Sequence, residues 1–340
     1  MRIVKRLAAL LSAIPFCFPV LSSADEEFHL AQIQPEPYVT IETPEINATY
    51  DKGGTLRVTA SGINVDSIEA VLTWSDPNGM QNMMSMMAHM DILDYTFQLE
   101  DICCSALLTV TGEVADASGI ILSKSITRQI LSPKQYYINC MIELAERNSK
   151  QERYRFAPAE RDTDIGICKN FVMRLFDTFK ADYRMLAYPE LPMHMPLNNS
   201  KAACAPYDYG IEWRPETAED GSPFEIVRQF KYNNDLSSDE NAAIARELMH
   251  QVQKGDFLQM VGYYGGGNGP HSLFFIQDYD PDSDKLHWTD SNMRGKRING
   301  ERWGYMQFDA EATAEWYVKV FNMKKRGATL YRLREDLYRP

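Results

Sequence analysis

The chain has no excess of positive charge and, after its first residues, no long apolar run. It contains 35 Lys and Arg against 47 Asp and Glu in 340 residues, a net charge of −12. A surface of this sign repels the phosphates of nucleic acid and favours solubility, so we expect no nucleic-acid partner. No later segment approaches the roughly 20 uninterrupted apolar residues of a membrane-spanning helix, so we expect no membrane span.

The beginning of the chain has the composition of a cleavable secretory signal peptide. Arg2, Lys5 and Arg6 precede an apolar stretch over 7–21, and Ser22-Ser23-Ala24 follows before an acidic run. This pattern predicts a signal peptide over 1–24, cleaved after Ala24. Cys17 lies within the apolar stretch without the Leu-Ala-Gly-Cys-like context of a lipidated cysteine. We therefore expect a soluble exported protein, periplasmic or secreted, with a mature net charge of −15 after loss of three basic residues.

Cysteine is scarce, and the mature chain keeps an odd number. The five are Cys103, Cys104, Cys140, Cys168 and Cys204. In an oxidising compartment an odd count leaves at least one thiol free or paired between molecules, and Cys168 is the best placed to be free. Cys103 and Cys104 are adjacent, so each is expected to pair elsewhere, for example with Cys140 or Cys204, in a connectivity that stays open. Cys168 as a small buried hydrophobe is the alternative.

The first part of the mature chain reads as short strands. Residues 25–37 are polar with Pro35 and Pro37, which indicates a linker. Between 38 and 131, alternating apolar segments are separated by turn residues, which predicts an all-β immunoglobulin-like sandwich. The segment LLTVTGEVADASGIILSKSI resembles bacterial immunoglobulin-like modules, although the Cys…Trp…Cys spacing of antibody domains is absent. The predicted strands are 38–41, 56–60, 68–74, 95–99, 106–111 and 123–127.

Methionine is concentrated in one segment of this region, at 80, 83, 84, 86, 87 and 90, next to His89. Thioethers and imidazole are ligands that suit copper(I), so a copper site is one interpretation. The other is a strand and its loop, in which the methionines fill an irregular core or an interface. We favour the second and expect no metal and no cofactor.

The pattern changes after Pro133, and residues 132–340 form the second predicted domain. Apolar residues recur at helical spacing over 135–147 and 168–183. A loop-rich stretch over 188–223 leads to a helix over 238–252, for which Ser238 is the expected N-cap. Strands are expected at 256–261, 271–276 and 285–290. Helices followed by antiparallel strands indicate an α+β domain.

Three residue types with catalytic chemistry occur in order along this domain. Cys168 stands at the start of a predicted helix, whose N-terminus favours the thiolate, and Gly166 lets the chain turn tightly before it. His271 begins a strand after a glycine-rich loop and can serve as the base. Asp290 and Asn292 share a face of the next strand and can orient the imidazole, whereas His287 points the other way.

This order resembles the CHAP amidases and the NlpC-type cell-wall peptidases of the papain-like superfamily. The similar segments are ICKNFV, QKGDFLQMV and GPHSLFFIQDYDPDSDKLHWTDSN, within Cys168 to Asn292. The resemblance implies a papain-like fold in which a helix carries Cys168 and an antiparallel sheet carries His271 and Asp290. Gly255-Asp256 matches the Gly-Asp element before the first core strand. The insert between Cys168 and Gly255 is long, and no Gln upstream of Cys168 is evident as an oxyanion donor.

The resulting prediction is an exported cysteine amidase or endopeptidase. Cys168 attacks an amide carbonyl, His271 transfers the proton, and Asp290, helped or replaced by Asn292, orients His271. The resemblance implies peptidoglycan of the cell wall as substrate. A protein-directed cysteine protease or acyltransferase, or a non-catalytic surface binding or adhesion protein, remains an alternative. On the simplest structural interpretation, His271 is a core residue, while Asp256 and Asp290-Ser291-Asn292 belong to turns.

Overall fold

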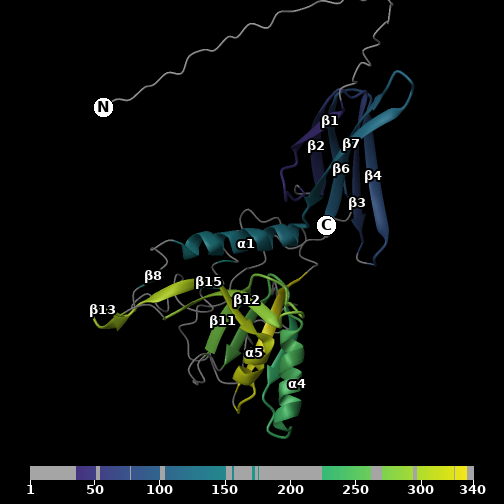
Figure 1. Ribbon diagram of the computed structural model, residues 1–340. Helices are drawn as coiled ribbons and strands as arrows, with labels where there is room; N and C mark the ends of the chain where they lie inside the picture. The colour runs from purple at the N-terminus through teal and green to yellow at the C-terminus, as the bar shows by residue number, and fades with distance from the viewer. Residues whose placement is uncertain are drawn as a thin grey trace, which may run out of the picture. The chain divides into compact units, whose positions relative to one another are not determined.

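The computed structural model describes residues 36–50, 54–76, 78–99, 104–150, 155–156, 171–172, 175, 224–261, 270–293, 297–324 and 326–334. The predicted signal peptide, most of the linker over 25–37 and the loop-rich stretch over 188–223 lie outside them. The described residues form antiparallel sheets with three helices of eight or more residues (Figure 1). None of the described helices combines the length and the apolar character that crossing a membrane requires.

The segment before residue 131 folds into two antiparallel sheets. One has three strands in the order β1-β2-β5, and the other has four in the order β4-β3-β6-β7. Buried and exposed residues alternate along the central strands, as in β3, where Ile68, Ala70 and Leu72 are fully buried. The strands are β1 (Tyr38–Thr43), β2 (Thr55–Ile63), β3 (Ser67–Ser75), β4 (Gln81–Ala88), β5 (Ile92–Gln98), β6 (Ala106–Ala115) and β7 (Ile121–Ile130).

Side chains from both sheets form one hydrophobic cluster. Val58 of β2, Leu72 of β3 and Val110 of β6 are 0% exposed and belong to it. All six strands predicted from the sequence are present, and the methionine segment forms β4. The prediction for 38–131 is therefore confirmed in a coarser form, as a β-rich region of antiparallel sheets.

Helix α1 (Pro133–Ser149) follows directly after this region. The Ser132 hydroxyl accepts a hydrogen bond from the Gln135 backbone N–H, and Pro133 starts the helix where its missing N–H costs nothing. The predicted helix over 135–147 is thus present. Tyr137, Ile138 and Met141 lie on its buried face.

The later part of the chain forms a seven-stranded antiparallel sheet in the order β8-β15-β12-β11-β10-β16-β9. The three predicted strands of this domain are present as β10, β11 and β12, side by side. Strands β8, β9, β15 and β16 complete the sheet and were not predicted. β8 has only two residues, charged or polar residues interrupt the apolar alternation of β9 and β15, and β16 is buried on both faces and shows no alternation. The strands are β8 (Arg155–Phe156), β9 (Phe224–Lys231), β10 (Phe257–Val261), β11 (Pro270–Phe275), β12 (Lys285–Asn292), β15 (Gly304–Thr313) and β16 (Gly327–Leu333), with a separate hairpin of β13 (Arg297–Ile298) and β14 (Glu301–Arg302).

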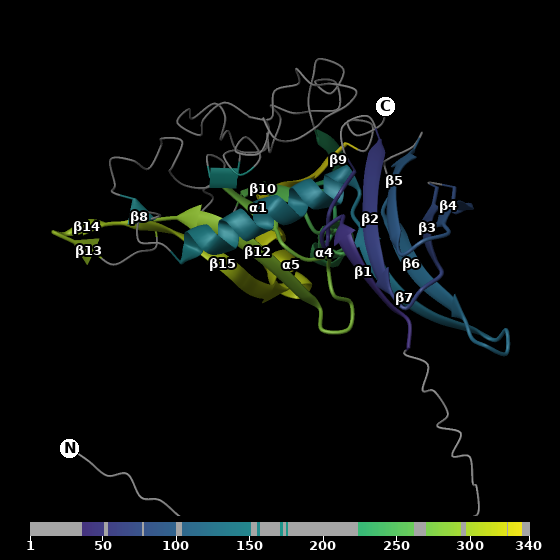
Figure 2. The same ribbon diagram turned by 90° about the horizontal axis from the view of Figure 1, so that it is seen from above.

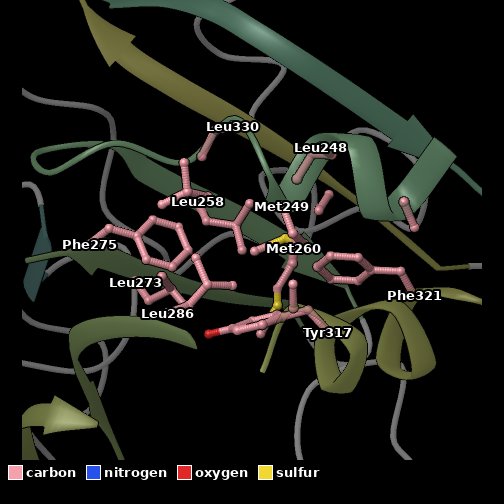
Figure 3. Packing of buried hydrophobic residues seen from close by; sticks show 14 of the residues in the cluster. Leu248, Met249, Leu258, Met260, Leu273, Phe275, Leu286, Tyr317, Phe321 and Leu330 are labelled. Atoms are coloured by element: carbon pink, nitrogen blue, oxygen red, sulfur yellow. The ribbon is translucent and has the colours of Figure 1, made fainter. Parts of the chain in front are cut away.

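Each face of this sheet has its own hydrophobic cluster. Phe257 and Phe274 belong to the cluster that contains the buried face of α1. Leu258 and Met260 belong to the second cluster, with residues of α4 (Ser238–Met249) and α5 (Ala314–Phe321). Successive residues of a strand point to opposite faces, so α1 covers one face and α4 and α5 cover the other. Figures 2 and 3 show α1 along the sheet and the packing of the second cluster.

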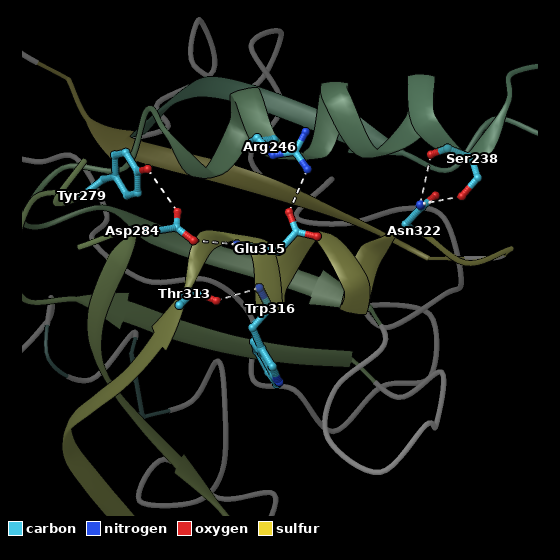
Figure 4. Close-up of polar contacts among 8 residues, drawn as sticks. All are labelled: Ser238, Arg246, Tyr279, Asp284, Thr313, Glu315, Trp316 and Asn322. Atoms are coloured by element: carbon cyan, nitrogen blue, oxygen red, sulfur yellow. Dashed lines mark hydrogen bonds and ion pairs between the residues drawn. The ribbon is translucent and has the colours of Figure 1, made fainter. Parts of the chain in front are cut away.

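Helices α4 and α5 are joined by polar contacts (Figure 4). Arg246 of α4 forms an ion pair with Glu315 of α5 at 2.7 Å, and the Asn322 amide donates to Ser238. The prediction that Ser238 caps α4 is wrong by one residue. Ser237 is the N-cap, since its hydroxyl accepts from the Glu240 N–H while the Glu240 carboxylate accepts from the Ser237 N–H, which forms a capping box.

Candidate functional site

The structure brings two of the predicted site residues into direct contact. His271 Nε2 lies 2.8 Å from Asp290 Oδ2, and both side chains are 0% exposed. A carboxylate at this distance accepts the Nε2 proton, which makes Nδ1 the basic nitrogen of a neutral ring. We refer to these two residues as the buried His-Asp pair.

The pair spans two neighbouring strands. His271 is the second residue of β11, opposite Met260 of β10, and Asp290 lies near the end of β12. β11 and β12 pair with Phe274 opposite Thr289, which places Asp290 diagonally across from His271. Met260 belongs to the cluster of α4 and α5, so the pair lies on the face of the sheet that these helices cover.

Trp288 makes a second contact to the same carboxylate. Its indole Nε1 lies 3.4 Å from Asp290 Oδ2, two residues along the same face of β12. Trp288 itself is 2% exposed and packs edge-on against Tyr317 of α5, with ring centroids 5.6 Å apart. This packing fixes the indole, and the indole in turn helps to orient the carboxylate.

His287 provides a comparison on the same strand. Its Nδ1 lies 2.7 Å from Asp309 Oδ1 of β15, with the two side chains 19% and 52% exposed. The expected alternation holds, because His287 points away from the face that carries Trp288 and Asp290. Among the described residues, the sheet therefore contains a buried histidine-carboxylate pair and, through His287 and Asp309, a second pair that is partly exposed.

Asn292 is not the residue that holds the His271 ring through Nε2. It lies opposite Tyr305 of β15 and is partly buried. Its side-chain oxygen accepts a hydrogen bond from the Met293 backbone N–H at 2.7 Å. Asp290, and not Asn292, is the observed partner of His271 Nε2.

Cys168 lies outside the described residues, and so do Gly166 and the loop over 262–269. Three residues of the predicted helix that follows Cys168 are described, namely Phe171, Val172 and Leu175. They are buried in the cluster that includes α1. The described part of this segment therefore packs on the face of the sheet opposite to the buried His-Asp pair.

Sequence reasoning did not find a row of buried polar residues on the α1 face. Gln259 of β10 lies directly between Ser272 of β11 and Thr329 of β16, and these are 3%, 2% and 0% exposed. Within the described part of the chain, Gln259 Oε1 has no hydrogen-bond partner. The row is detectable in the sequence as single polar residues inside otherwise apolar strands.

Asp256, which the sequence suggested as a turn residue, binds Arg332 in addition to the backbone of its own turn. Its carboxylate accepts from the Gln253 N–H, as a turn residue does, and also forms two bonds of 2.8 and 2.7 Å with Arg332. Burial raises the pKa of Asp256, and the guanidinium opposes that rise. Asp256 therefore connects the start of β10 to β16, and it is not part of the buried His-Asp pair.

Comparisons with known proteins place the chain in no family. Neither the protein-family models, nor the curated proteins, nor the solved structures include a match. Among the residues that the structure describes, no three His, Cys, Asp or Glu side chains gather in a position to hold a metal ion.

Proposed function

We propose that the chain is an exported cysteine amidase or endopeptidase that cleaves amide bonds of peptidoglycan. The observation that carries the proposal is the 2.8 Å contact between His271 and Asp290, two residues selected from the sequence as base and orienting group. In this proposal the later domain is papain-like and the earlier one an immunoglobulin-like arm.

The proposed reaction has two steps. The Cys168 thiolate attacks the carbonyl carbon, the C–N bond breaks, and the imidazolium of His271 gives its proton to the leaving amine. Water then attacks the thioester, His271 takes the proton of the water, and the thiolate leaves as the acid product forms. Asp290 holds the ring so that Nδ1 carries out both transfers.

A non-catalytic binding protein is the second candidate, and two observations favour it. Both members of the pair are fully buried, and the described residues after Cys168 pack on the opposite face of the sheet. In this case the only role of the buried His-Asp pair is structural, because each side chain gives the other a hydrogen-bond partner in the core.

The test compares variants of the His271-Asp290 pair and of the His287-Asp309 pair. Each variant is incubated with purified peptidoglycan, and the released soluble fragments are measured by mass spectrometry. We expect Cys168→Ala to abolish release and Asp290→Asn to lower the rate by about 10²–10⁴-fold, the usual contribution of an oriented base. The matched control Asp309→Asn changes the partner of His287 and should leave the rate unchanged.

The thiol itself gives a readout that a structural pair would not change. In the parent, alkylation of Cys168 by iodoacetamide should be fast at neutral pH, because the imidazole stabilises the thiolate. In His271→Gln, the rate should rise only near the ordinary thiol pKa of about 8.5. Identical pH profiles of alkylation in the parent and in His271→Gln would overturn the catalytic proposal. If the enzyme cleaves protein substrates but leaves peptidoglycan intact, it is a protein-directed protease.

A further inference from the structure

Strand β4 is an edge strand that leaves one side open. It is the terminal strand of the sheet β4-β3-β6-β7 and pairs with β3 from Gln81 to Ala88. Within the described residues, no strand pairs with its other side. The backbone N–H and C=O groups on that side can therefore receive another strand.

The composition of β4 differs from that of the other three sheet edges in this region. Soluble proteins usually protect edge strands with charged residues, proline or bulges. The edge strands β1, β5 and β7 contain Glu42, Asp94 and the pair Lys124 and Arg128, respectively. Between Met80 and Met90 there is no Asp, Glu, Lys, Arg or Pro. β4 is thus the unprotected edge among the four.

The methionines of this segment are arranged symmetrically about Ser85. Met84 and Met86 flank it at one residue, Met83 and Met87 at two, and Met80 and Met90 at five. If two copies of β4 pair antiparallel with Ser85 opposite Ser85, the four methionines within the strand, at 83, 84, 86 and 87, each lie opposite a methionine of the second copy. A two-fold interface requires a surface that is complementary to itself, and this strand has that property.

Both faces of the strand contribute to such a pairing. Met84 and Met86 lie opposite Leu72 and Ala70 of β3, whose side chains are buried, and remain 37% and 38% exposed. Met83 and Met87 point to the outer face and are 68% and 44% exposed. Thioether side chains adapt to one another without a fixed shape, so matching rows can pack on each face of the joined sheet.

The charge of the chain favours contact along this strand over other surfaces. Each copy has a net charge of −12, so two copies repel each other over most of their surface. An uncharged apolar strip is the place where that repulsion is weakest and burial is most favourable. The methionine row itself selects a second copy of the chain as the occupant, because a copy presents the same symmetric row.

We propose that β4 is a homodimerisation strand, through which two copies join their four-stranded sheets into one continuous antiparallel sheet about a two-fold axis at Ser85. The interface requires no cysteine, metal or other domain. It is independent of the proposed hydrolase activity.

The first test measures the oligomeric state of the purified full chain by sedimentation at concentrations from ~1 to ~100 µM, which cover the usual affinities of small interfaces. We expect the parent to dimerise. Ser85→Lys places two ammonium groups opposite each other and should weaken the dimer at least ~10-fold. Ser123→Lys, an exposed position on the charged edge β7, is the matched control and should leave the dimer intact. A monomeric parent, or a dimer equally stable in both variants, would overturn the proposal.

The second test fixes the alignment of the strands by disulfide formation. Residues directly opposite in an antiparallel pair have Cα atoms roughly 4.5–5.5 Å apart, within the range of a disulfide. Ser85→Cys should therefore give a covalent dimer on non-reducing gels beyond any seen in the parent. In Met83→Cys the two new thiols lie four residues apart along the strands, roughly 13 Å, and should not join. Equal cross-linking of the two variants would exclude a two-fold axis at Ser85.

Discussion

At the scale of residues, two buried ionisable pairs stand out, and they have different partners. Asp290 meets an imidazole and an indole, groups that can be neutral. Asp256 meets the permanently charged guanidinium of Arg332, whose side chain is 19% exposed against 1% for the carboxylate. Only the first pair can transfer a proton near neutral pH, since a guanidinium does not lose its proton. Asp256 is therefore expected to matter for stability and not for turnover.

Arg332→Met tests this role by removing the charge while keeping the apolar stem. Burial is then opposed only by the Gln253 N–H and the charge of Lys134, so the pKa of Asp256 rises further. We expect a loss of about 3 kcal/mol in the free energy of unfolding at pH 7, the usual effect of leaving a buried charge unpaired. Urea denaturation measures it.

The pH dependence of this loss has a defined direction. A carboxyl whose pKa is higher in the folded than in the unfolded state binds its proton more tightly when folded, so stability increases as the pH falls through the folded pKa. The defect of Arg332→Met should therefore be largest at neutral pH and shrink in acid. Arg57→Met removes an exposed partner of Asp94, with side chains 62% and 53% exposed, and should show no measurable change. A defect that is constant with pH would contradict this account.

At the scale of elements, Gly255 connects the packing of α1 to the start of β10. Its φ is +93°, and its N–H donates to the Phe275 carbonyl of β11. A Cβ at this position would lie 2.4 Å from Ile138 Cδ1 of α1. The residue is therefore glycine for two reasons, the backbone conformation and the close approach of the helix. The Gly-Asp sequence thus has a structural explanation apart from any family resemblance.

Gly255→Ala should lower the free energy of unfolding by about 2–4 kcal/mol, the sum of backbone strain and overpacking. Gly300→Ala is the matched control. Its φ is +85°, but no heavy atom lies within 4 Å of the added Cβ, so only the strain of about 1 kcal/mol remains. Thermal and urea unfolding of both variants measure the difference.

A second substitution separates the cost of overpacking against α1 from the cost of backbone strain. Ile138→Ala removes all three atoms that the new Cβ would meet, namely Cδ1, Cγ1 and Cγ2 of Ile138. Combined with Gly255→Ala, it should cost less than the sum of the two single changes. Strict additivity would show that the contact with α1 contributes nothing to the defect.

At the scale of the whole molecule, the described chain has hydrophobic clusters that share no residue across position 131. One lies within Val39 to Ile130, and the other two lie within Tyr137 to Leu333. Stability in such a chain need not be uniform, because each cluster can open without the others.

Leu72→Ala tests this separation. Leu72 is 0% exposed, so its truncation should destabilise the first cluster by about 2–5 kcal/mol. Amide hydrogen exchange followed by mass spectrometry should show faster exchange in β3 and β6 and unchanged exchange in β10 and β11. Leu258→Ala, also 0% exposed, should give the converse result. Faster exchange in all four strands after either change would show a single cooperative unit.

The sequence predicted the strands and helices whose apolar residues follow a clear period. β1 to β3, β5 to β7, α1, α4 and β10 to β12 were found in this way. β15 was missed because Gln307 and Asp309 interrupt its alternation, and β16 because it is buried on both faces and shows none. Pairing with neighbours on both sides stabilises both strands. The cap of α4 was placed one residue late. Ser237 and Ser238 are equivalent by propensity, but only Ser237 has a glutamate three residues later, Glu240, as a capping box requires.

The sequence by itself determined that this is an acidic, β-rich chain and that His271 and Asp290 stand on successive strands of one sheet. Local periodicity and residue chemistry are enough for these conclusions. Only the tertiary structure decided that Asp290, and not Asn292, contacts His271, that Asp256 pairs with Arg332, and that β4 is an open edge. These depend on strand alignment and burial, which arise from contacts between residues far apart in the chain and which no local pattern encodes.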